Sequence, residues 1–516
     1  MASYTIFRLI ICIQIIITIS VKFLLYQYTC HHIHFPDLSI DSPGYKTDQP
    51  TFSWRRILTD KSGMQVITPW EEYNTVSHRL GYKTKVSNES FSCINETENM
   101  TTEVFQMCQI YRQFVIYRLS NYEDAEVKFT DYIPGLVKYL DYKANLVSLG
   151  GKYIPRAFHI PYHIKEFLQY SRLSENQNKM WVQKNPWHRG NMVKEYYELN
   201  FTQESVIQEF IENPFLVDGR KFSIGIYVAF SSAKPLRAYV LNSTATLRFC
   251  PQEYDPHNFT DMKTHITDGL EFGAQLVREV DSLKDYSWKH QYSPLQSLDA
   301  HVDLVGYDPS AIHLQINDAI RDVLSTREDL ITKITRKIDA RSRHFMLTRW
   351  DFILDSDMKI HLIEVNSNPA MSCTTLPTDK LDPLFCNNVI YNLYRVMGIA
   401  SFYDFHKTSI EYVIRDSDIH VKNAICYTTV CTLCEAKECQ LCSKCLSDTQ
   451  REILKSVLWE HLRRGETRLV YPFAKTEPMK PNYTSRSSRA NTIDDDELTT
   501  EWLRFKCNTD IQWCSV

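Results

Sequence analysis

The spacing of apolar side chains predicts alternating strands and helices in the middle of the chain. Residues 222–230 and 236–242 alternate or run apolar, as buried strands do. Isoleucine and leucine recur at helical spacing over residues 311–338. Two further apolar runs, residues 349–355 and 359–366, are separated by a short polar turn and predict a β-hairpin. The middle of the chain is therefore expected to form an α/β (α+β) domain.

The amino-terminal end carries a separate apolar pattern. Residues 9–21 form a run of 13 residues, bounded by Arg8 and Lys22. This length suits the core of a signal peptide, whereas a membrane span needs about 20 residues. If Lys22 extends its ammonium toward the lipid headgroups, residues 4–28 just reach across a bilayer. The pattern favours an uncleaved signal anchor and a single-pass membrane protein. A cleaved signal peptide and a membrane-surface or buried helix are the alternatives.

Glycosylation and cysteine patterns bear on the compartment. Six cysteines between Cys426 and Cys445 indicate a disulfide knot in an oxidising lumen, or a zinc site in the cytosol. The charges around the apolar run weakly favour a lumenal position for the bulk of the chain. Three N-x-[ST] sequons within twelve residues also favour the lumen and a glycoprotein. The chain's sequons are at Asn88, Asn95, Asn99, Asn200, Asn242, Asn258 and Asn482.

Composition excludes some classes of protein. The 516 residues are 43% hydrophobic and 23% charged, which is typical of a globular protein with a sizeable core. The 58 lysines and arginines and the 62 aspartates and glutamates leave a net charge of −4. A nucleic-acid partner held by bulk positive charge is therefore not expected.

Three oxygen-bearing side chains occur in the predicted hairpin. Asp351 lies in its first strand, and Glu364 and Asn366 lie two residues apart at the end of its second. Strand periodicity places Glu364 and Asn366 on one face, where Asp351 would complete a set of oxygen donors. Such a set suits Mg²⁺, with nucleotide phosphates filling the remaining positions. The alternative is an amphipathic hairpin with polar ends.

A second group of residues indicates phosphate binding. Lys184 ends a short apolar run and precedes a loop that contains Arg189 and Gly190. A lysine beside a glycine-containing loop can pair with phosphates while backbone N–H groups approach them. Residues 208–211 form an extended segment ahead of Lys221, and such a backbone can hydrogen-bond a planar base. A buried sheet strand is the alternative for this segment.

Together these stretches resemble the ATP-grasp domain of the tubulin–tyrosine ligase-like family. The matching strings follow the family's order across residues 150–375. They are IPRAFHIPYHIKEF, WVQKNPWHRG, IQEFIENPFLVDGRKF, PLRAYVLNSTATLRFC, MKTHITD and DFILDSDMKIHLIEVNSNPAM. The resemblance implies two β-rich lobes that grip ATP with Mg²⁺. It also implies amide-bond formation through an acyl phosphate, with L-glutamate as the incoming amino acid and tubulin or another acidic protein as the acceptor.

The resemblance assigns roles to individual positions. The residues that it places at the reacting groups are Lys184, Arg189 and Arg248, the last of which matches an arginine that holds glutamate. The residues that it places around the nucleotide are Lys184, Arg189, Gly190, Gln208, Glu209, Phe210, Ile211, Lys221, Ser223, Thr267 and Asp268. The metal ligands that it implies are Asp351, Glu364 and Asn366.

Several positions depart from the family pattern. The phosphate loop has Met192 where the family has a second glycine, and a Cβ restricts how the loop approaches phosphate. Ser223 and Gly225 replace an aspartate and an arginine in the family's Lys-Phe-Asp-x-Arg run. Losing an arginine that faces the transferred phosphate costs about 10³-fold or more in rate. Arg237 and Arg220 are the candidates to compensate.

Two classes of function remain open from the sequence. The first is an ATP-dependent glutamate ligase of the tubulin polyglutamylase type, with a glycine-adding ligase and a ligase for a secretory-pathway protein as variants. The second is a membrane-tethered pseudo-ligase that binds nucleotide or acts as a scaffold. Tubulin would require a catalytic domain in the cytosol near microtubules, which conflicts with the lumenal signals.

The expected domains run from a signal anchor through an N-terminal region and the ATP-grasp domain to a helical and cysteine-rich module and a mobile polar tail. Their boundaries are residues 1–29, 30–145, 146–400, 401–475 and 476–516.

Overall fold

The structure is a computed structural model, and every described residue belongs to one compact unit, Gln49–Val516. The described residues are 51–57, 83–85, 111–117, 127–131, 133–186, 191–233, 235–267, 277–335, 342–367, 369, 383–398, 415–421, 423–436, 439–472 and 495–509. The predicted signal anchor, Arg189, Gly190, Asp268 and four sequons, at Asn88, Asn95, Asn99 and Asn482, lie outside these ranges. Every helix within them is too short or too polar to span a bilayer.

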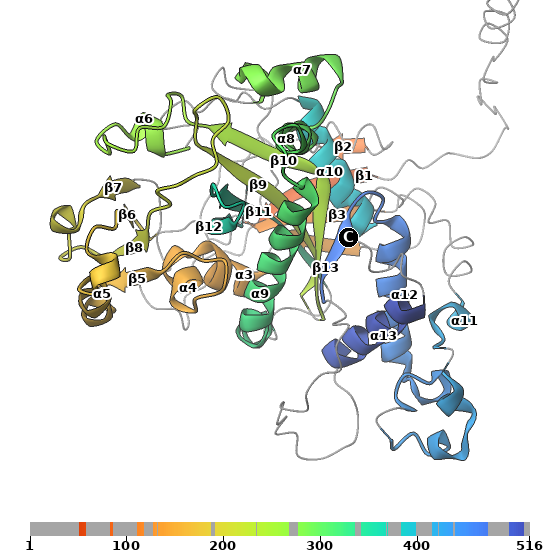
Figure 1. Cartoon of the computed structure of the whole chain (residues 1–516). Coiled ribbons are helices and arrows are strands. Elements are labelled where there is room, and N and C mark those ends of the chain that lie inside the picture. Colours follow the sequence, from red (N-terminus) through yellow and green to blue (C-terminus); the bar gives the residue numbers. More distant parts are fainter. Residues whose placement is uncertain are drawn as a thin grey trace, which may run out of the picture. The chain divides into compact units, whose positions relative to one another are not determined.

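A nine-stranded mixed sheet forms the framework (Figure 1). Its strands are β1 (Thr51–Ile57), β2 (Lys83–Lys85), β3 (Tyr111–Tyr117), β4 (Val127–Asp131), β9 (Phe222–Ala233), β10 (Leu236–Phe249), β11 (Ser342–Leu354), β12 (Ile360–Asn366) and β13 (Arg468–Tyr471). The order is β13-β10-β9-β11-β4-β3-β1-β2, with β12 also paired to β11. Neighbours are antiparallel except β1 with β2 and β4 with β11. The sheet therefore crosses the domain boundaries predicted at residues 146 and 401.

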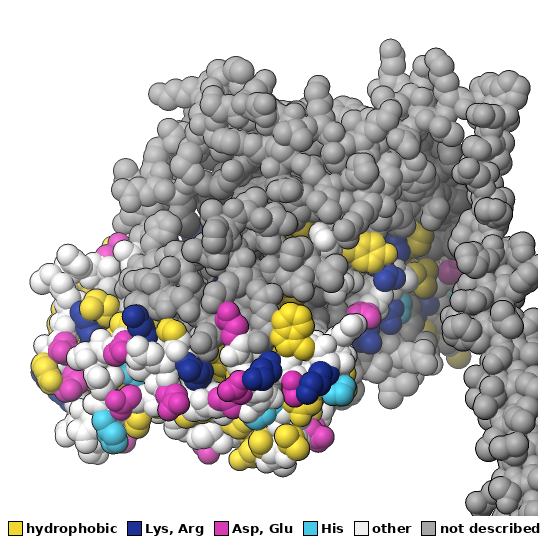
Figure 2. Space-filling view, turned by 90° about the horizontal axis from the view of Figure 1, so that it is seen from above, with side chains coloured by type: hydrophobic (Ala, Val, Ile, Leu, Met, Phe, Trp, Pro, Cys, Tyr) yellow, Lys and Arg dark blue, Asp and Glu magenta, His cyan; other side chains and the backbone are white. Residues whose placement is uncertain are grey.

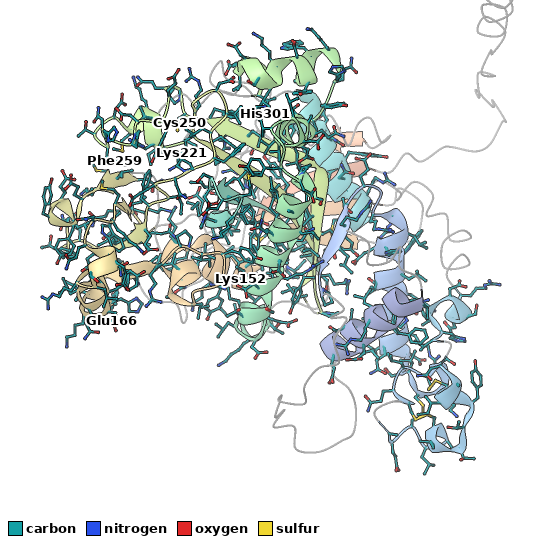
Figure 3. All side chains as sticks on the ribbon, viewed as in Figure 1. Lys152, Glu166, Lys221, Cys250, Phe259 and His301 are labelled. Carbon is teal, nitrogen blue, oxygen red and sulfur yellow. A yellow bond between two sulfur atoms is a disulfide. The ribbon has the colours of Figure 1, made fainter. Side chains whose placement is uncertain are left out.

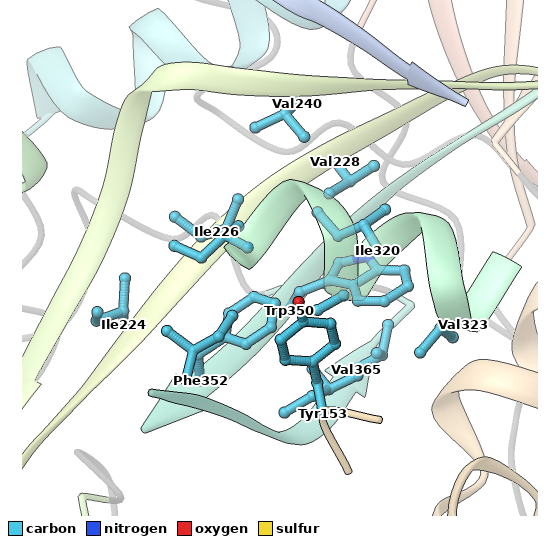
Figure 4. Packing of buried hydrophobic residues seen from close by; sticks show 14 of the residues in the cluster. Tyr153, Ile224, Ile226, Val228, Val240, Ile320, Val323, Trp350, Phe352 and Val365 are labelled. Carbon is cyan, nitrogen blue, oxygen red and sulfur yellow. The ribbon is translucent and has the colours of Figure 1, made fainter. Parts of the chain in front are cut away.

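The helix α9 (Pro309–Thr335) packs on one face of this sheet and forms the main hydrophobic core (Figure 4). Ile224, Ile226 and Val228 alternate along β9 and are at most 2% exposed. Because a strand has a period of two, these side chains share a face, and the intervening residues lie on the other. The predicted strands at residues 222–230 and 236–242, the hairpin and the long helix are thus confirmed.

Shorter helices cover the edges of the large sheet. The helix α8 (Pro294–Leu304) begins with a capping box, in which Ser293 and Gln296 each accept the other's backbone N–H, and with proline at its first position. The other described helices of this part are α3 (Pro134–Leu136), η2 (Val137–Asp141), α4 (Lys143–Ser148), η5 (Val277–Glu279), α7 (Asp281–Lys289) and α10 (Pro383–Met397). The helix α10 packs against β9 and β10.

A second, four-stranded antiparallel sheet has the order β5-β8-β6-β7. Its strands are β5 (Ala157–Ile160), β6 (Trp181–Lys184), β7 (Met192–Lys194) and β8 (Ser205–Glu209). The helices around it are α5 (Ile164–Ser171), η3 (Ser174–Asn176), η4 (Tyr196–Glu198) and α6 (Met262–His265). The helix α4 contacts both β8 and β12 and so bridges the two sheets. This arrangement is consistent with the two β-rich lobes that the sequence predicts.

The cysteine-rich module is held by three disulfides. They join Cys426 to Cys442, Cys431 to Cys439 and Cys434 to Cys445. The six cysteines therefore pair with one another, as the lumenal interpretation predicted, and do not form the alternative zinc site. The module's short helices are α11 (Asp416–Ile419), η7 (Ala424–Tyr427), η8 (Thr429–Cys431) and η10 (Ser443–Cys445).

Two longer helices follow, α12 (Asp448–Arg463) and α13 (Asp495–Thr509). The first lies within residues 401–475, where the sequence predicts a helical and cysteine-rich module. The second corrects the prediction of a mobile tail over residues 476–516, because Trp502 of α13 is fully buried and donates a hydrogen bond to the carbonyl of Ile419 (2.8 Å). The apolar residues of α13 that pack against α12 are too few to stand out within a polar segment.

A buried ion pair joins α12 to the sheet. The guanidinium of Arg237 in β10 donates to both oxygens of Glu460, at 2.7 and 2.9 Å. The hydroxyls of Ser231 (2.8 Å) and Tyr239 (3.1 Å) donate to the same carboxylate. Such a fully hydrogen-bonded carboxylate ties the carboxyl-terminal helices to the sheet, and it commits Arg237 to a structural role.

We expect Glu460→Ala to lower the free energy of unfolding by about 3–5 kcal/mol, because it removes the carboxylate that compensates the buried Arg237 charge. Arg237→Met combined with Glu460→Met should cost less than this single change, because no buried charge remains. Urea denaturation measures both, with exposed Glu466→Ala as the control. A single variant no less stable than the double variant would contradict this account.

Candidate functional site

The hairpin of β11 and β12 brings the three predicted metal ligands together. Asp351 is paired with Glu364 across the hairpin, and Arg349 is paired with Asn366. The amide of Asn366 donates hydrogen bonds to Asp351 (2.9 Å) and to Glu364 (3.3 Å). The side chains therefore converge on the face opposite α9.

The turn of the hairpin fixes this register. One oxygen of Asp355 accepts hydrogen bonds from the backbone N–H groups of Asp357 (3.0 Å) and Lys359 (2.9 Å). These bonds close the polar turn that the sequence predicted. A one-residue slip would move the carboxylates of β12 to the other face, so the turn is part of the site.

A β-bulge beside Asp351 changes the pairing within the hairpin. The register shifts by one residue, which leaves Ile363 unmatched across the strands. Its carbonyl accepts a hydrogen bond from the ammonium of Lys184, 3.4 Å away. The bulge thus connects a lysine of the smaller sheet to the carboxylate cluster of the larger one.

Lys184 ends β6 and is only 4% exposed. Its Nζ also donates to the side-chain oxygen of Gln208 (2.7 Å), whose amide donates in turn to the carbonyl of Pro155 (3.3 Å). Burial lowers the pKa of Lys184 to about 8, although the charge of Glu364 raises it. These hydrogen-bond acceptors are neutral, so the ammonium charge is available to an anionic ligand.

Glu364 is held in its ionised form by neighbouring basic side chains. Burial raises its pKa, but the positive charges of Lys143, Lys184 and Arg349 outweigh burial and lower the pKa to about 2. Lys143 begins α4, and its Nζ lies 3.6 Å from the Glu364 carboxylate. Glu364 therefore carries its charge throughout the physiological pH range.

Asp351 is held by Arg349. Two nitrogens of the guanidinium donate to the two oxygens of Asp351, each at 2.7 Å. Burial raises the pKa of Asp351, and the positive charge of Arg349 opposes that rise. A bidentate pair of this kind fixes the plane of the carboxylate as well as its charge.

The strands β9 and β10 extend the same face. Arg248 of β10 is paired with Ser223 of β9, whose hydroxyl accepts a hydrogen bond from Thr267 (3.0 Å). Burial lowers the pKa of Arg248, and the charge of Arg349 lowers it further. The residue predicted to hold the amino-acid substrate therefore lies within electrostatic range of the carboxylate cluster.

Lys221 is a second buried lysine and lies beside Cys250 (Figure 3). The ammonium of Lys221 is 3.9 Å from the centre of the Phe210 ring, and the side chain is 1% exposed. Burial lowers its pKa to about 7, and the charge of Lys184 contributes to this shift. The adjacent Cys250 thiol has a pKa raised by burial to about 12 and stays neutral. Ile211 follows Phe210 and is partly exposed.

Other expected residues are engaged elsewhere. The carboxylate of Glu209 accepts a hydrogen bond from the Tyr170 hydroxyl (2.8 Å) and pairs with Lys179. Arg220 donates to two backbone carbonyls that follow β10, and Arg237 pairs with Glu460. The structure therefore gives Arg220 and Arg237 local partners and does not support the expectation that either replaces the arginine missing at position 225.

Two residues of the cluster were not predicted. Arg349 had a usable signal, because it lies two residues before Asp351 in the same strand and so shares its face. Lys143 had none, because folding alone brings the start of α4 to Glu364 from a distant part of the chain.

The charges of the site suit an anion. Four basic side chains surround two carboxylates, and a triphosphate would compensate the excess positive charge. These are Lys143, Lys184, Arg248 and Arg349 around Asp351 and Glu364. Glu364 and Asn366 supply oxygen donors that fit Mg²⁺, whereas Asp351 fits only in part because its oxygens already accept three hydrogen bonds. The buried Thr246 hydroxyl has no hydrogen-bond partner among the described residues.

The chain resembles known proteins over most of this region. It matches the family described as the tubulin-tyrosine ligase family over residues 99–407. It is 27% identical over 398 residues to the probable tubulin polyglutamylase ttll-15 of Caenorhabditis elegans, covering 75% of this chain and 74% of that protein. It is 24% identical over 273 residues to the tubulin polyglutamylase TTLL5 of Homo sapiens, covering 50% and 20%. It is 27% identical over 174 residues to the inactive polyglycylase TTLL10 of Homo sapiens, covering 33% and 24%. The matches thus span less than a quarter of the two human proteins.

We expect the affinity for tripolyphosphate to fall as the pH rises through about 7 and then about 8. A lysine whose pKa is lowered by burial loses its proton over this range, and the anion binds the protonated form. Above both pKa values, each deprotonated lysine should lower the affinity by up to about 10-fold for each further pH unit. One pH unit corresponds to roughly 1.4 kcal/mol of binding free energy. Calorimetry at pH 6–9 measures it.

Lys221→Met should remove the lower of these two steps, whereas Lys165→Met, on the exposed surface of α5, should leave both unchanged. An affinity that is independent of pH in the unmodified protein would show that neither lysine contacts the anion.

Proposed function

The chain belongs to the tubulin-tyrosine ligase family, because the family match covers more than half of its residues, and from this premise we propose that it is an ATP-dependent ligase that adds glutamate to protein glutamate side chains. The observation that carries the proposal is the convergence of Lys184 with Glu364 and Asn366 from two separate sheets. The family resemblance that was found in the sequence motifs is confirmed.

ATP would bind between the residues of the two sheets. Lys184 and Lys221 would hold its phosphates, and Gln208 would keep Lys184 in place. Glu364 and Asn366 would hold Mg²⁺, which neutralises phosphate charge when bound. The side chains of Glu364 and Asn366 are already oriented by a hydrogen bond between them, so the binding of Mg²⁺ would require little reorganisation.

The reaction needs no side-chain nucleophile. An oxygen of the acceptor carboxylate forms a bond to the γ-phosphorus of ATP, and the bond from that phosphorus to the ADP oxygen breaks. The amine of glutamate then attacks the acyl carbon, inorganic phosphate leaves with the electron pair, and the amine loses a proton. Lys184 would stabilise the charge that develops on the transferred phosphoryl group. Arg248 would hold the amino acid.

The acceptor is proposed to be an acidic protein segment. The names of two relatives refer to tubulin polyglutamylation, which makes tubulin the first acceptor to test. On the described part of the face in Figure 2, acidic and basic side chains are interspersed, so this surface does not attract an acidic chain by one uniform charge. Recognition of the acceptor would therefore rest on contacts close to the reacting groups.

A pseudo-ligase is the second candidate. Ser223 and Gly225 lack the charges that the family pattern has at these positions, and one relative is named as inactive. A protein of this kind would bind nucleotide without glutamate-dependent turnover. The two functions therefore differ in a single measurable property.

We also propose that the described body faces an oxidising lumen, with residues 1–29, whose core is the apolar run 9–21, as its membrane anchor. The three disulfides of the cysteine-rich module support this location, because disulfides persist in the secretory pathway and are rare in the cytosol. In that compartment the acceptor would be an acidic secretory-pathway protein, and a cytosolic body near microtubules is the alternative.

We expect the purified full-length protein to release ADP in the presence of Mg·ATP, glutamate and an acceptor such as tubulin or a polyglutamate peptide. Glu364→Gln should reduce the rate about 100-fold or more, because it removes the charged oxygen donor. A coupled ADP assay measures this, and Glu166→Gln, on the exposed surface of α5, is the matched control. ATP binding without turnover would favour the pseudo-ligase.

We expect the cellular protein to shift in electrophoretic mobility on treatment with a glycosidase. Asn258 lies in an exposed turn, where its side-chain oxygen accepts hydrogen bonds from the N–H (3.1 Å) and hydroxyl (2.6 Å) of Thr260. Asn258→Gln should remove one increment of the shift. A protein without any shift, and with cysteines open to alkylation before reduction, would place the body in the cytosol.

A further inference from the structure

The space above Gly225 is filled by side chains of both neighbouring strands, Thr246 of β10 and Arg349 and Asp351 of β11. Gly225 of β9 is paired with Asp351 of β11. A Cβ at position 225 would lie 3.0 Å from the Cδ of Arg349, 3.0 Å from the Asp351 carboxylate and 2.3 Å from the Thr246 hydroxyl. A side chain at position 225 would therefore have to displace the Thr246 hydroxyl and would crowd Arg349 and Asp351. Glycine at position 225 therefore suits its surroundings, and the position differs from the family pattern in more than the absence of a charge.

Arg349 is itself built into the site. It is 7% exposed, and both oxygens of Asp351 accept its hydrogen bonds at 2.7 Å. The amide of Asn366 donates to one of the same oxygens, so Asp351 accepts three hydrogen bonds. A carboxylate that is paired in this way presents few lone pairs to a metal ion, and the adjacent guanidinium repels one.

We propose that Arg349 is a built-in counter-cation of the nucleotide site, which positions Asp351 and supplies from β11 the positive charge that β9 lacks at Gly225. It acts as a positioning residue through Asp351, and it takes up charge on this carboxylate that a divalent ion would otherwise neutralise. The charge that is missing at position 225 is thus supplied from position 349. This inference rests on the proposed nucleotide binding, and a metal-binding measurement tests it separately.

The physical consequence concerns the dependence of the site on divalent ions. With Arg349 in place, Asp351 is neutralised within the protein, and Glu364 is the carboxylate left for Mg²⁺. The unmodified protein should therefore bind ATP with only a modest requirement for a divalent ion. Without Arg349, Asp351 and Glu364 would form a pair of facing carboxylates, which is a stronger site for a divalent ion.

The first measurement uses Mn²⁺ alone on the full-length protein without nucleotide. Arg349→Met should raise the Mn²⁺ affinity about 10-fold or more, because it frees both oxygens of Asp351. Arg349→Lys keeps the charge but not the bidentate geometry, so its Mn²⁺ affinity should lie between those of the unmodified protein and Arg349→Met. Arg172→Met, on the exposed surface after α5, is the control. An unchanged or lower Mn²⁺ affinity in folded Arg349→Met would overturn the proposal, whether or not the protein binds ATP.

The second measurement compares ATP affinity with Mg²⁺ and with EDTA, by a fluorescent ATP analogue. In Arg349→Met the affinity in EDTA should fall about 10-fold, while the affinity in Mg²⁺ falls less. A purely structural role for Arg349 would lower both affinities equally and would refute the proposal. Failure of the unmodified protein to bind ATP in either condition would instead refute the proposed function, and the Mn²⁺ result would still decide the role of Arg349.

An exchange variant covers the case in which Arg349→Met does not fold. It combines Arg349→Gly with Gly225→Arg, and it includes Thr246→Ala to remove the hydroxyl that a Cβ at 225 would meet. Returning the arginine to β9 should restore a folded protein with the low Mn²⁺ affinity of the unmodified one. An exchange variant that unfolds, or that binds Mn²⁺ about 10-fold or more tightly than the unmodified protein, would show that an arginine at position 225 does not replace Arg349. Either result would contradict the proposal.

Discussion

The compensation of buried charge is the constraint on which the site depends. Arg349 is buried and Arg248 is half-buried on one face of the large sheet, and the buried Lys184 reaches this face from the smaller sheet, so that isolated charges here would be expensive. Two carboxylates offset part of this charge, and hydrogen bonds from an asparagine and to a bulge carbonyl hold the groups in place. The remaining positive charge is the property that an anionic ligand would use.

The opposite face of the same strands explains why the groups can be held so closely. Ile224, Ile226 and Val228 pack against α9, so β9 cannot rotate or slip without exposing apolar surface. Alternate residues of the strand are thereby fixed on the site face. The hydrophobic core thus sets the register, and the register sets the distances between the charges.

The departures from the family pattern take on a different meaning in three dimensions. Gly225 is lined by Thr246, Arg349 and Asp351, so its lack of a side chain is matched by its surroundings. Arg237 belongs to the connection with α12, where it meets Glu460. The charge that is absent at position 225 of β9 is accompanied in space by the charge of Arg349 on the adjacent strand, and only the pairing of the two strands brings the two positions together.

Periodicity along the chain sufficed for β9, the hairpin, α9 and the shared face of Glu364 and Asn366, because these patterns are local and repeat every two or 3.6 residues. The family motifs identified Lys184 and Gln208, because these motifs are also local stretches of sequence. Four features depended on packing between distant segments: the contact of Lys143 with Glu364, the bulge at Ile363, the disulfide pairing and the buried helix α13. No local pattern encodes which distant groups become neighbours, since that is settled by how whole strands and helices cover one another.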